Sequence, residues 1–140
     1  MAVRKVLILC TGNSCRSQMA EALVNHDLAG AWVAESAGTR PAAAVHPLAV
    51  AVMDEIGIDI QTQQPKTIDA VRDHPFDLVV TVCANAAAEC PMWPGRATTV
   101  HIGFDDPAEA TGSPDQIRAE FRRVRDEIRH TVLDYLTHKA

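Results

Sequence analysis

The sequence lacks the features that mark a membrane-spanning, secreted or nucleic-acid-binding protein. Its N-terminal apolar run, residues 6–10, is too short for a secretory signal, and no later run approaches the length of a membrane span. No internal repeat or low-complexity tract is visible. The formal net charge is −5, so the overall field does not attract nucleic acids or anionic membranes. We therefore expect a cytoplasmic protein that binds neither, and any site for an anion must be locally positive.

A metal-binding pattern is also missing. The four cysteines, Cys10, Cys15, Cys83 and Cys90, form no CxxC pair, and the six histidines are scattered along the chain. Zinc sites typically need such closely spaced ligand pairs, so we expect no bound metal. The cytoplasm keeps thiols reduced, which argues against structural disulfides. The cysteines therefore need a different explanation.

Apolar and amphipathic segments alternate along the chain. Strands are expected at residues 4–9, 31–36, 76–82 and 98–102, and helices at residues 17–29, 46–56 and 114–138, with a short helix at 68–72. Such alternation indicates a parallel sheet covered on both faces. The 140 residues fit one domain, residues 1–140. We therefore expect an α/β fold, a three-layer doubly wound domain with a four-stranded parallel sheet.

The first strand leads into the segment CTGNSCRS, residues 10–17, which we call the anion loop. A glycine-containing turn can fold its N–H groups inward as an anion nest, and the helix that begins near Ser17 presents its positive end to the same point. Such surroundings lower a thiol pKa from about 8.5 to roughly 3.5–7.5. We expect the Cys10 thiolate to attack a tetrahedral oxyanion. The predicted binding residues are Thr11, Gly12, Asn13, Ser14, Cys15, Arg16 and Ser17.

Three residues of this loop have further expected roles. The guanidinium of Arg16 offers a planar fork of donors that suits phosphate and its isosteres. Asn13 is expected to adopt a left-handed conformation that turns the loop. Ser17 has two compatible interpretations, as a hydrogen-bond donor to the thiolate and as the N-cap of the helix.

Chemistry-bearing residues follow the ends of three predicted strands. Cys10 follows the first strand, Cys83 the third, and Asp105 and Asp106 the fourth. Ligands of open parallel sheets bind beyond the carboxyl ends of the strands, so these residues should cluster. A carboxylic acid that faces the anion can protonate the departing oxygen, and we assign this role to Asp106, which precedes Pro107. Asp105 competes for it, and the sequence does not decide which side chain points inward.

Cys83 and Cys90 have two interpretations. They are either buried small apolar residues or a redox pair. A disulfide needs Cα atoms within about 7 Å, which two helical turns do not allow, so the intervening segment would have to unwind. Residues 84–89 carry little side-chain bulk that would prevent it. With a nucleophilic cysteine nearby, the redox interpretation is favoured.

The chain resembles the thioredoxin-coupled arsenate reductases, which are built on the low-molecular-weight tyrosine phosphatase fold. CTGNSCRSQMAEAL resembles their anion loop and first helix, ESAGTR the second strand and turn, VVTVC with ECP the redox pair, and GFDDPA with FRRVRDEI the acid loop and last helix. The resemblance implies that Cys10 attacks arsenate while Asp106 protonates the leaving hydroxyl. Cys83 would then form a Cys10–Cys83 disulfide and expel arsenite. Cys90 would convert this bond into a Cys83–Cys90 disulfide, which thioredoxin reduces.

The resemblance also bears on Cys15 and on potassium. Cys15 resembles a family cysteine outside the relay, so we expect it to be structural and liable to oxidation. Some family members bind potassium with Asn, Glu and Ser side chains and a carboxylate. Asn13, Glu21 and Ser36 match these positions, whereas Lys66 stands in place of the carboxylate. We hypothesise that the Lys66 ammonium supplies the positive charge instead of potassium. The expected partners are arsenate and thioredoxin, with no bound cofactor, and the chain is expected to be a monomer.

Two other functions compete with this one. A low-molecular-weight protein tyrosine phosphatase would use Cys10, Arg16 and Asp106 in the same places and hydrolyse a phosphocysteine. Against it, Gln18 replaces the proline expected at the end of the phosphatase loop, and Ala108 replaces the aromatic residue expected after Asp-Pro. The other alternative is a non-catalytic sensor that binds arsenite or reports oxidation through its later cysteines.

Overall fold

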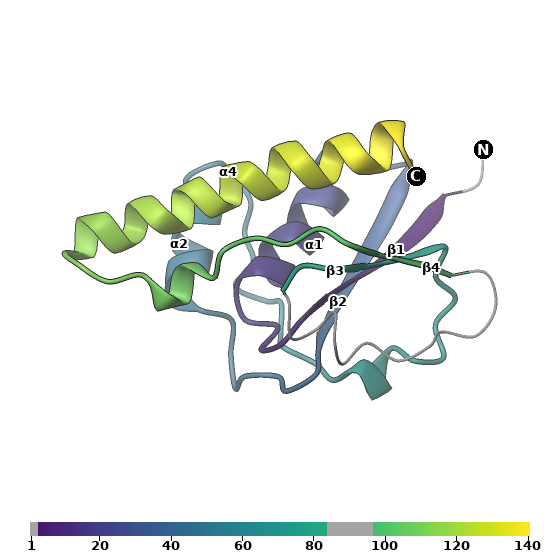
Figure 1. The fold of residues 1–140 in the computed structure, drawn as a ribbon, viewed down its shortest axis with the longest axis horizontal. Coiled ribbons are helices and arrows are strands. Elements are labelled where there is room, and N and C mark those ends of the chain that lie inside the picture. The colour runs from purple at the N-terminus through teal and green to yellow at the C-terminus, as the bar shows by residue number, and fades with distance from the viewer. Residues whose placement is uncertain (1–2, 84–96) are drawn as a thin grey trace.

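The computed structural model describes residues 3–83 and 97–140, which fold around a four-stranded parallel sheet (Figure 1). The strands are β1 (Arg4–Cys10), β2 (Trp32–Gly38), β3 (Leu78–Thr81) and β4 (Thr98–His101), in the order β2-β1-β3-β4. All three neighbouring pairs are parallel. The predicted α/β class and the four-stranded parallel sheet are therefore confirmed.

The α-helices of the described part are α1 (Arg16–Asp27), α2 (Pro47–Asp54) and α4 (Pro114–His138), and two 3-10 helices are η1 (Ile68–Ala70) and η2 (Pro107–Glu109). Figure 1 shows α4 lying across α1 and α2, with η1 on the other side of the sheet. The start of α4 is fixed by a capping box: Gln116 N donates to Ser113 Oγ at 3.1 Å, and Ser113 N donates to Gln116 Oε1 at 2.8 Å. The expected bounds of this helix are confirmed.

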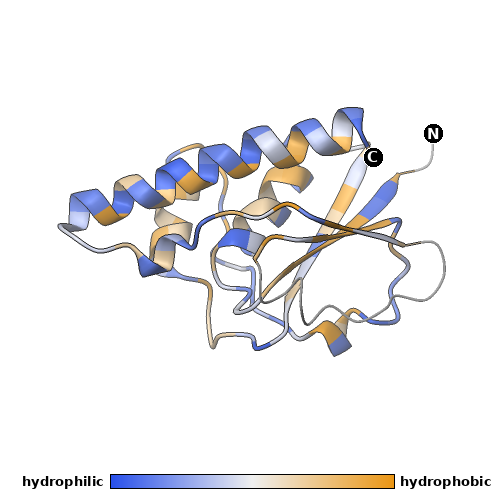
Figure 2. Cartoon of the chain, in the orientation of Figure 1, coloured by the Kyte–Doolittle hydropathy of each residue, from blue (hydrophilic) through white to orange (hydrophobic). Residues whose placement is uncertain are grey.

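The core lies between the sheet and the helices α1 and α4. Val6 to Leu9 of β1 are fully buried, as expected for a central parallel strand covered on both faces. Helix α4 contributes an apolar stripe at helical spacing, which is visible as orange segments along its inner side in Figure 2. Its buried apolar residues are Phe121, Val124, Ile128, Val132 and Leu136. Burial of each such side chain stabilises the fold by about 1.5–3 kcal/mol, which keeps α4 packed on α1 and α2.

Several predicted boundaries differ from the structure. Strand β2 continues through Ala37 to Gly38, where a turn was expected, because it stays paired with β1 as far as the Cys10–Gly38 register. Helix α1 begins at Arg16 and its N-cap is Cys15, so the prediction that Ser17 caps this helix is wrong. The short helix expected at 68–72 is the 3-10 turn η1.

None of the helices in residues 3–83 and 97–140 is both long enough and apolar enough to cross a bilayer.

Candidate active site

The backbone of the anion loop is held from outside by the segment 39–46. Four N–H groups of that segment donate to loop carbonyls: Thr39 to Cys10, Arg40 to Thr11, Ala42 to Gly12 and His46 to Ser14, at 2.8–3.3 Å. On the donor side, the N–H groups of Gly12, Asn13 and Ser14 have no acceptor among the described residues. Unpaired N–H groups at the start of a helix are what an anion nest provides.

Asn13 is the turning point of the loop. Its φ is +49°, so the predicted left-handed conformation is confirmed. The side chain is fully buried. Its Nδ2 donates to Ser17 Oγ at 2.7 Å, and its Oδ1 accepts from Lys66 N at 3.0 Å. Ser17 therefore acts as an acceptor inside the loop, and its contact with a Cys10 thiolate stays a prediction.

One cavity of about 510 Å³ lies over the anion loop. It brings together side chains that follow three different strands, as the strand-end argument predicted. The residues that line it are Cys10, Thr11, Gly12, Ser14, Cys15, Arg16, Cys83, Phe104, Asp106 and Glu109. Among the predicted site residues, Asn13 and Ser17 do not line the cavity and are fully buried. Cys90 lies outside the described residues.

Arg16 is oriented by two contacts on one side of its guanidinium. Nη1 donates to the carbonyl of Phe104 at 3.0 Å, and Nη2 lies 3.5 Å from Asp106 Oδ2. Its Nε is buried and has no hydrogen-bond partner within the described parts of the chain. A buried donor without a partner is unfavourable, and a hydrogen bond from this Nε to an oxyanion in the cavity would offset that cost.

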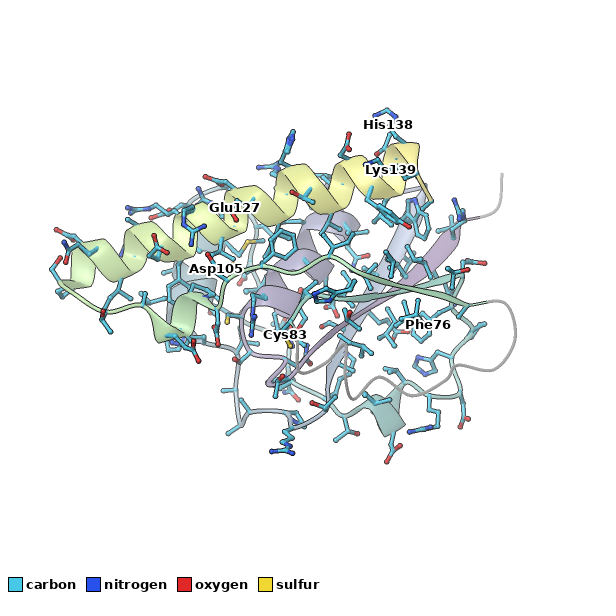
Figure 3. The ribbon with its side chains drawn as sticks, viewed as in Figure 1. Phe76, Cys83, Asp105, Glu127, His138 and Lys139 are labelled. Carbon is cyan, nitrogen blue, oxygen red and sulfur yellow. The ribbon has the colours of Figure 1, made fainter. Side chains whose placement is uncertain are left out.

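The structure distinguishes the two neighbouring aspartates. Asp106 lines the cavity, where its Oδ1 accepts from Cys15 Sγ at 3.6 Å and from Ala108 N at 3.0 Å. Asp105 is exposed and forms an ion pair with Arg123 of α4 at 3.1 Å. Figure 3 shows Asp105 below Glu127 of α4, with Cys83 farther from the helix. Asp106 is therefore the carboxylate that can reach a bound anion.

Cys83 lies against the anion loop. Its side chain is buried, and its Sγ is 3.2 Å from Thr11 Oγ1. A hydrogen bond also joins it to Cys10. The thiol that follows β3 thus contacts both the first and the second residue of the anion loop.

The acidity of Cys10 differs from the expectation. The hydrogen bond with Cys83 is the largest effect and raises the pKa of Cys10, burial raises it further, and Arg16 lowers it. The prediction of a lowered pKa is therefore wrong for this arrangement, because two buried thiols share one site. The two thiols titrate together, so the pair resists the loss of its second proton.

Cys15 has a different environment. Burial and the neighbouring Asp106 carboxylate raise the pKa of Cys15 to about 11. It therefore stays a thiol at neutral pH.

Two cavity residues were not identified from the sequence. Phe104 and Glu109 lie on either side of Asp106 in the chain and line the mouth of the cavity. Their closeness to the fourth strand end was the only signal that could have indicated them.

The residues compared with a potassium site form a small cluster behind the loop. Ser36 Oγ donates to Glu21 Oε1 at 2.9 Å, and Lys66 Nζ lies 3.5 Å from the same oxygen. Within residues 3–83 and 97–140, no group of three or more His, Cys, Asp or Glu side chains is arranged to hold a metal ion.

The family model described as low molecular weight phosphotyrosine protein phosphatase matches residues 5–139. The chain belongs to this family. An arsenate reductase of Halalkalibacterium halodurans is 51% identical over 91% of each chain. A solved arsenate reductase in an oxidised state has a TM-score of 0.81 at 29% identity, covering 96% of this chain and 98% of the other. The thioredoxin-dependent arsenate reductase of Corynebacterium glutamicum has a TM-score of 0.68 at 28% identity, covering 99% of this chain and 64% of that one. The predicted resemblance to arsenate reductases of the phosphatase fold is confirmed.

Proposed function

We propose that this protein is an arsenate reductase that works through a relay of Cys10, Cys83 and Cys90 and is regenerated by thioredoxin. One observation carries the proposal: a single cavity holds two thiols, Cys10 and Cys83, together with Arg16. Phosphate ester hydrolysis needs only the first thiol. A second thiol in contact with the first is what a redox reaction requires.

The first step uses the anion loop. Arsenate binds through the loop N–H groups and the free Nε of Arg16, and the Cys10 thiolate forms a sulfur–arsenic bond. One arsenic–oxygen bond breaks, and Asp106 protonates the departing oxygen, which leaves as water. Arsenic is still pentavalent in this adduct.

The second step uses Cys83. Its thiolate attacks the sulfur of Cys10, so a Cys10–Cys83 disulfide forms and the sulfur–arsenic bond breaks. The electron pair of that bond goes to arsenic, which leaves as trivalent arsenite. Two thiols are thereby oxidised by two electrons, and arsenate is reduced by two. The contacts of Cys83 with Cys10 and Thr11 support this order.

The third step restores the anion loop. The Cys90 thiolate attacks Cys83 and releases Cys10, which leaves a Cys83–Cys90 disulfide for thioredoxin to reduce. A relative named as thioredoxin-dependent supports this choice of reductant. The relay needs a compartment that keeps thiols reduced, so we place it in the cytoplasm.

The proposal is tested by turnover in a coupled assay. With thioredoxin, thioredoxin reductase and NADPH, we expect arsenate to elicit NADPH consumption that depends on all three relay cysteines. Cys90→Ser should release one equivalent of arsenite and then stop, and Cys10→Ser should release none. Cys15→Ser should lose much less activity than Cys10→Ser, since Cys15 is not one of the three relay thiols.

The competing phosphatase function predicts a different result. Hydrolysis of an aryl phosphate with no arsenate-dependent NADPH consumption would overturn the reductase proposal. Multiple turnovers of Cys90→Ser with thioredoxin would contradict the order of the relay. The position after Pro107 is Ala108, which offers no ring to stack on a phosphotyrosyl group, so we expect arsenate to be the better substrate.

We propose further that Lys66 replaces a bound potassium ion. Its ammonium is 3.5 Å from Glu21 Oε1, where a cation can balance that carboxylate, and its backbone N–H donates to Asn13. Lys66 thus supplies both the positive charge beside Glu21 and a backbone hydrogen bond to Asn13 of the anion loop.

A further inference from the structure

Gln18 is a fully buried amide in the first turn of α1. A buried amide without partners costs free energy, so its hydrogen bonds show what it is there to hold. Its Nε2 donates to Asn13 O at 3.0 Å and to Asn13 Oδ1 at 3.1 Å. Both donor contacts of this side chain therefore go to the one non-glycine residue with positive φ among the described residues.

The side-chain and backbone oxygens of Gln18 also accept hydrogen bonds. Gln63 Nε2 donates to Gln18 Oε1 at 2.7 Å and to Gln18 O at 3.1 Å. This contact orients the amide of Gln18, because it holds the oxygen and leaves the nitrogen facing Asn13. A chain of two amides thus links the segment that contains Gln63 to the turn of the anion loop.

We propose that Gln18 is a positioning residue for the anion loop, which sets the left-handed turn at Asn13 and so the direction of the loop N–H groups. The nucleophile is held by a different device, since Cys10 is the last residue of β1 and pairs in register with Gly38 of β2. Loss of the Gln18 contacts should therefore weaken anion binding more than it slows the attack by Cys10. This proposal for Gln18 rests on the proposed arsenate reductase function only in the experiments that measure arsenate reduction.

The direct test is Gln18→Met, which keeps length and helix propensity but removes both donors. Inorganic phosphate serves as a tetrahedral probe that is not reduced, and its Kd is measured by calorimetry. We expect the phosphate Kd and the arsenate KM to rise about tenfold with kcat changed less than about threefold, as for a loss of uniform binding. Because phosphate binding needs no relay, it reports on Gln18 even if arsenate reduction fails.

A second variant gives a pH signature. In Gln18→Glu, the introduced carboxylate accepts from Gln63 but cannot donate to Asn13, and on protonation it regains one donor. We expect the ratio of its phosphate Kd to that of the unmodified protein to fall severalfold between about pH 8 and about pH 6. The same ratio for Gln18→Met, whose side chain does not titrate, should show no such trend.

The matched control is Asn25→Ala in the same helix. Asn25 also makes two hydrogen bonds through its side-chain amide, to Ala34 O and from Ala34 N, and both are with β2 rather than with the anion loop. We expect it to lower the melting temperature without changing the phosphate Kd.

Two results would overturn the proposal. One is a phosphate Kd within about twofold of the unmodified protein in a folded Gln18→Met variant. The other is an equal rise of the Kd in Asn25→Ala, which would show a global effect. If Gln18→Met does not fold, the test uses Gln63→Leu instead. Gln63 lies outside the buried core, so its replacement should leave the fold intact. Its removal should raise the Kd severalfold, and an unchanged Kd would overturn the proposal.

Discussion

The hydroxyl of Thr11 lies 3.2 Å from the sulfur of Cys83, which joins the anion loop to the residues that follow β3. Either atom can donate while Cys83 is a thiol, but only the hydroxyl can donate once Cys83 is the thiolate that the proposed relay needs. A hydroxyl that donates to a thiolate lowers the pKa of that thiol. Thr11 therefore connects the site of anion binding with the second thiol of the relay.

Replacement of Thr11 by valine should slow the second step of the relay. Thr11→Val removes the hydroxyl and keeps the shape, so Cys83 loses a contact that favours its thiolate. We expect release of the first equivalent of arsenite to slow by about threefold to tenfold, measured by rapid quench without thioredoxin. Thr11→Ser should restore most of the rate. An unchanged rate in Thr11→Val would show that the hydroxyl has no part in this step.

Any side chain at position 38 should disturb the anion loop. A Cβ on Gly38 would lie 2.6 Å from the carbonyl oxygen of Thr11 and 3.0 Å from Cβ of Asn13. We expect Gly38→Ala to lose about 1–3 kcal/mol in the free energy of unfolding and to weaken phosphate binding at least about tenfold. Gly30→Ala is the control, because Gly30 has a φ of +88° but open space around it. It should lose stability with phosphate binding unchanged, and equal binding losses in both variants would contradict the steric explanation.

The Lys66 ammonium behind the anion loop should make the activity and stability of the enzyme independent of potassium. With Lys66 beside Glu21, we expect the same kcat and melting temperature in potassium and sodium chloride of equal ionic strength. Lys66→Met should lose about 1 kcal/mol of stability, because the partly buried Glu21 carboxylate is left without its cation. Lys139→Met, near the C-terminus, serves as the control. A clear rise of activity and melting temperature with potassium, absent with sodium, would rule out the substitution of lysine for the ion.

A cluster around Glu55 should make stability fall in acid. Hydrogen bonds from Arg122 lower the pKa of Glu55 most, and Arg125 adds to the effect, so the pKa falls from 4.5 to about 2. A carboxyl with a lower pKa in the folded state stabilises the fold above its unfolded pKa, and this stabilisation is lost as the pH falls from about 4.5 to about 2.

The measurement compares two carboxylates by urea denaturation. Glu55→Gln should lose about 1 kcal/mol at pH 7, a discounted figure because Arg122 is largely exposed, and much less near pH 2. Asp69→Asn removes an exposed carboxylate whose ion-pair partner among residues 3–83 and 97–140 is Arg72, and it should have little effect at either pH. A loss for Glu55→Gln that is equal at both pH values would contradict the assignment.

Much of the fold follows from local pattern. The apolar run of β1 and the capped, periodic stripe of α4 could be read because each signal lies within its own element. The position of the cavity followed from the rule on strand ends, which needs only the order of strands and helices. Strand and helix ends were less accurate, since pairing of β2 with β1 as far as Gly38 depends on a partner strand.

The details of the site depend on contacts between distant parts of the chain. Asp106 lines the cavity while Asp105 pairs with Arg123 of α4, and no local pattern encodes that pairing. The raised pKa of Cys10 arises from Cys83, which lies on another strand end. Gln18 could be seen in the sequence as an unusual residue, but its bonds to Asn13 need the folded loop.

The support of the anion loop by segment 39–46 uses backbone N–H groups, which every residue except proline possesses. Thr39, Arg40, Ala42 and His46 donate them, and the two prolines of this region, Pro41 and Pro47, fall at positions between and after these donors. Side chains at the four donor positions can therefore change during evolution with little effect on the anion loop, while a new proline at any of them would remove a support. The anion loop thus rests on backbone bonds that tolerate different side chains but no proline at Thr39, Arg40 or Ala42, whereas His46 is constrained further, because its side chain accepts from Leu48 N at the start of α2 and packs on Phe121.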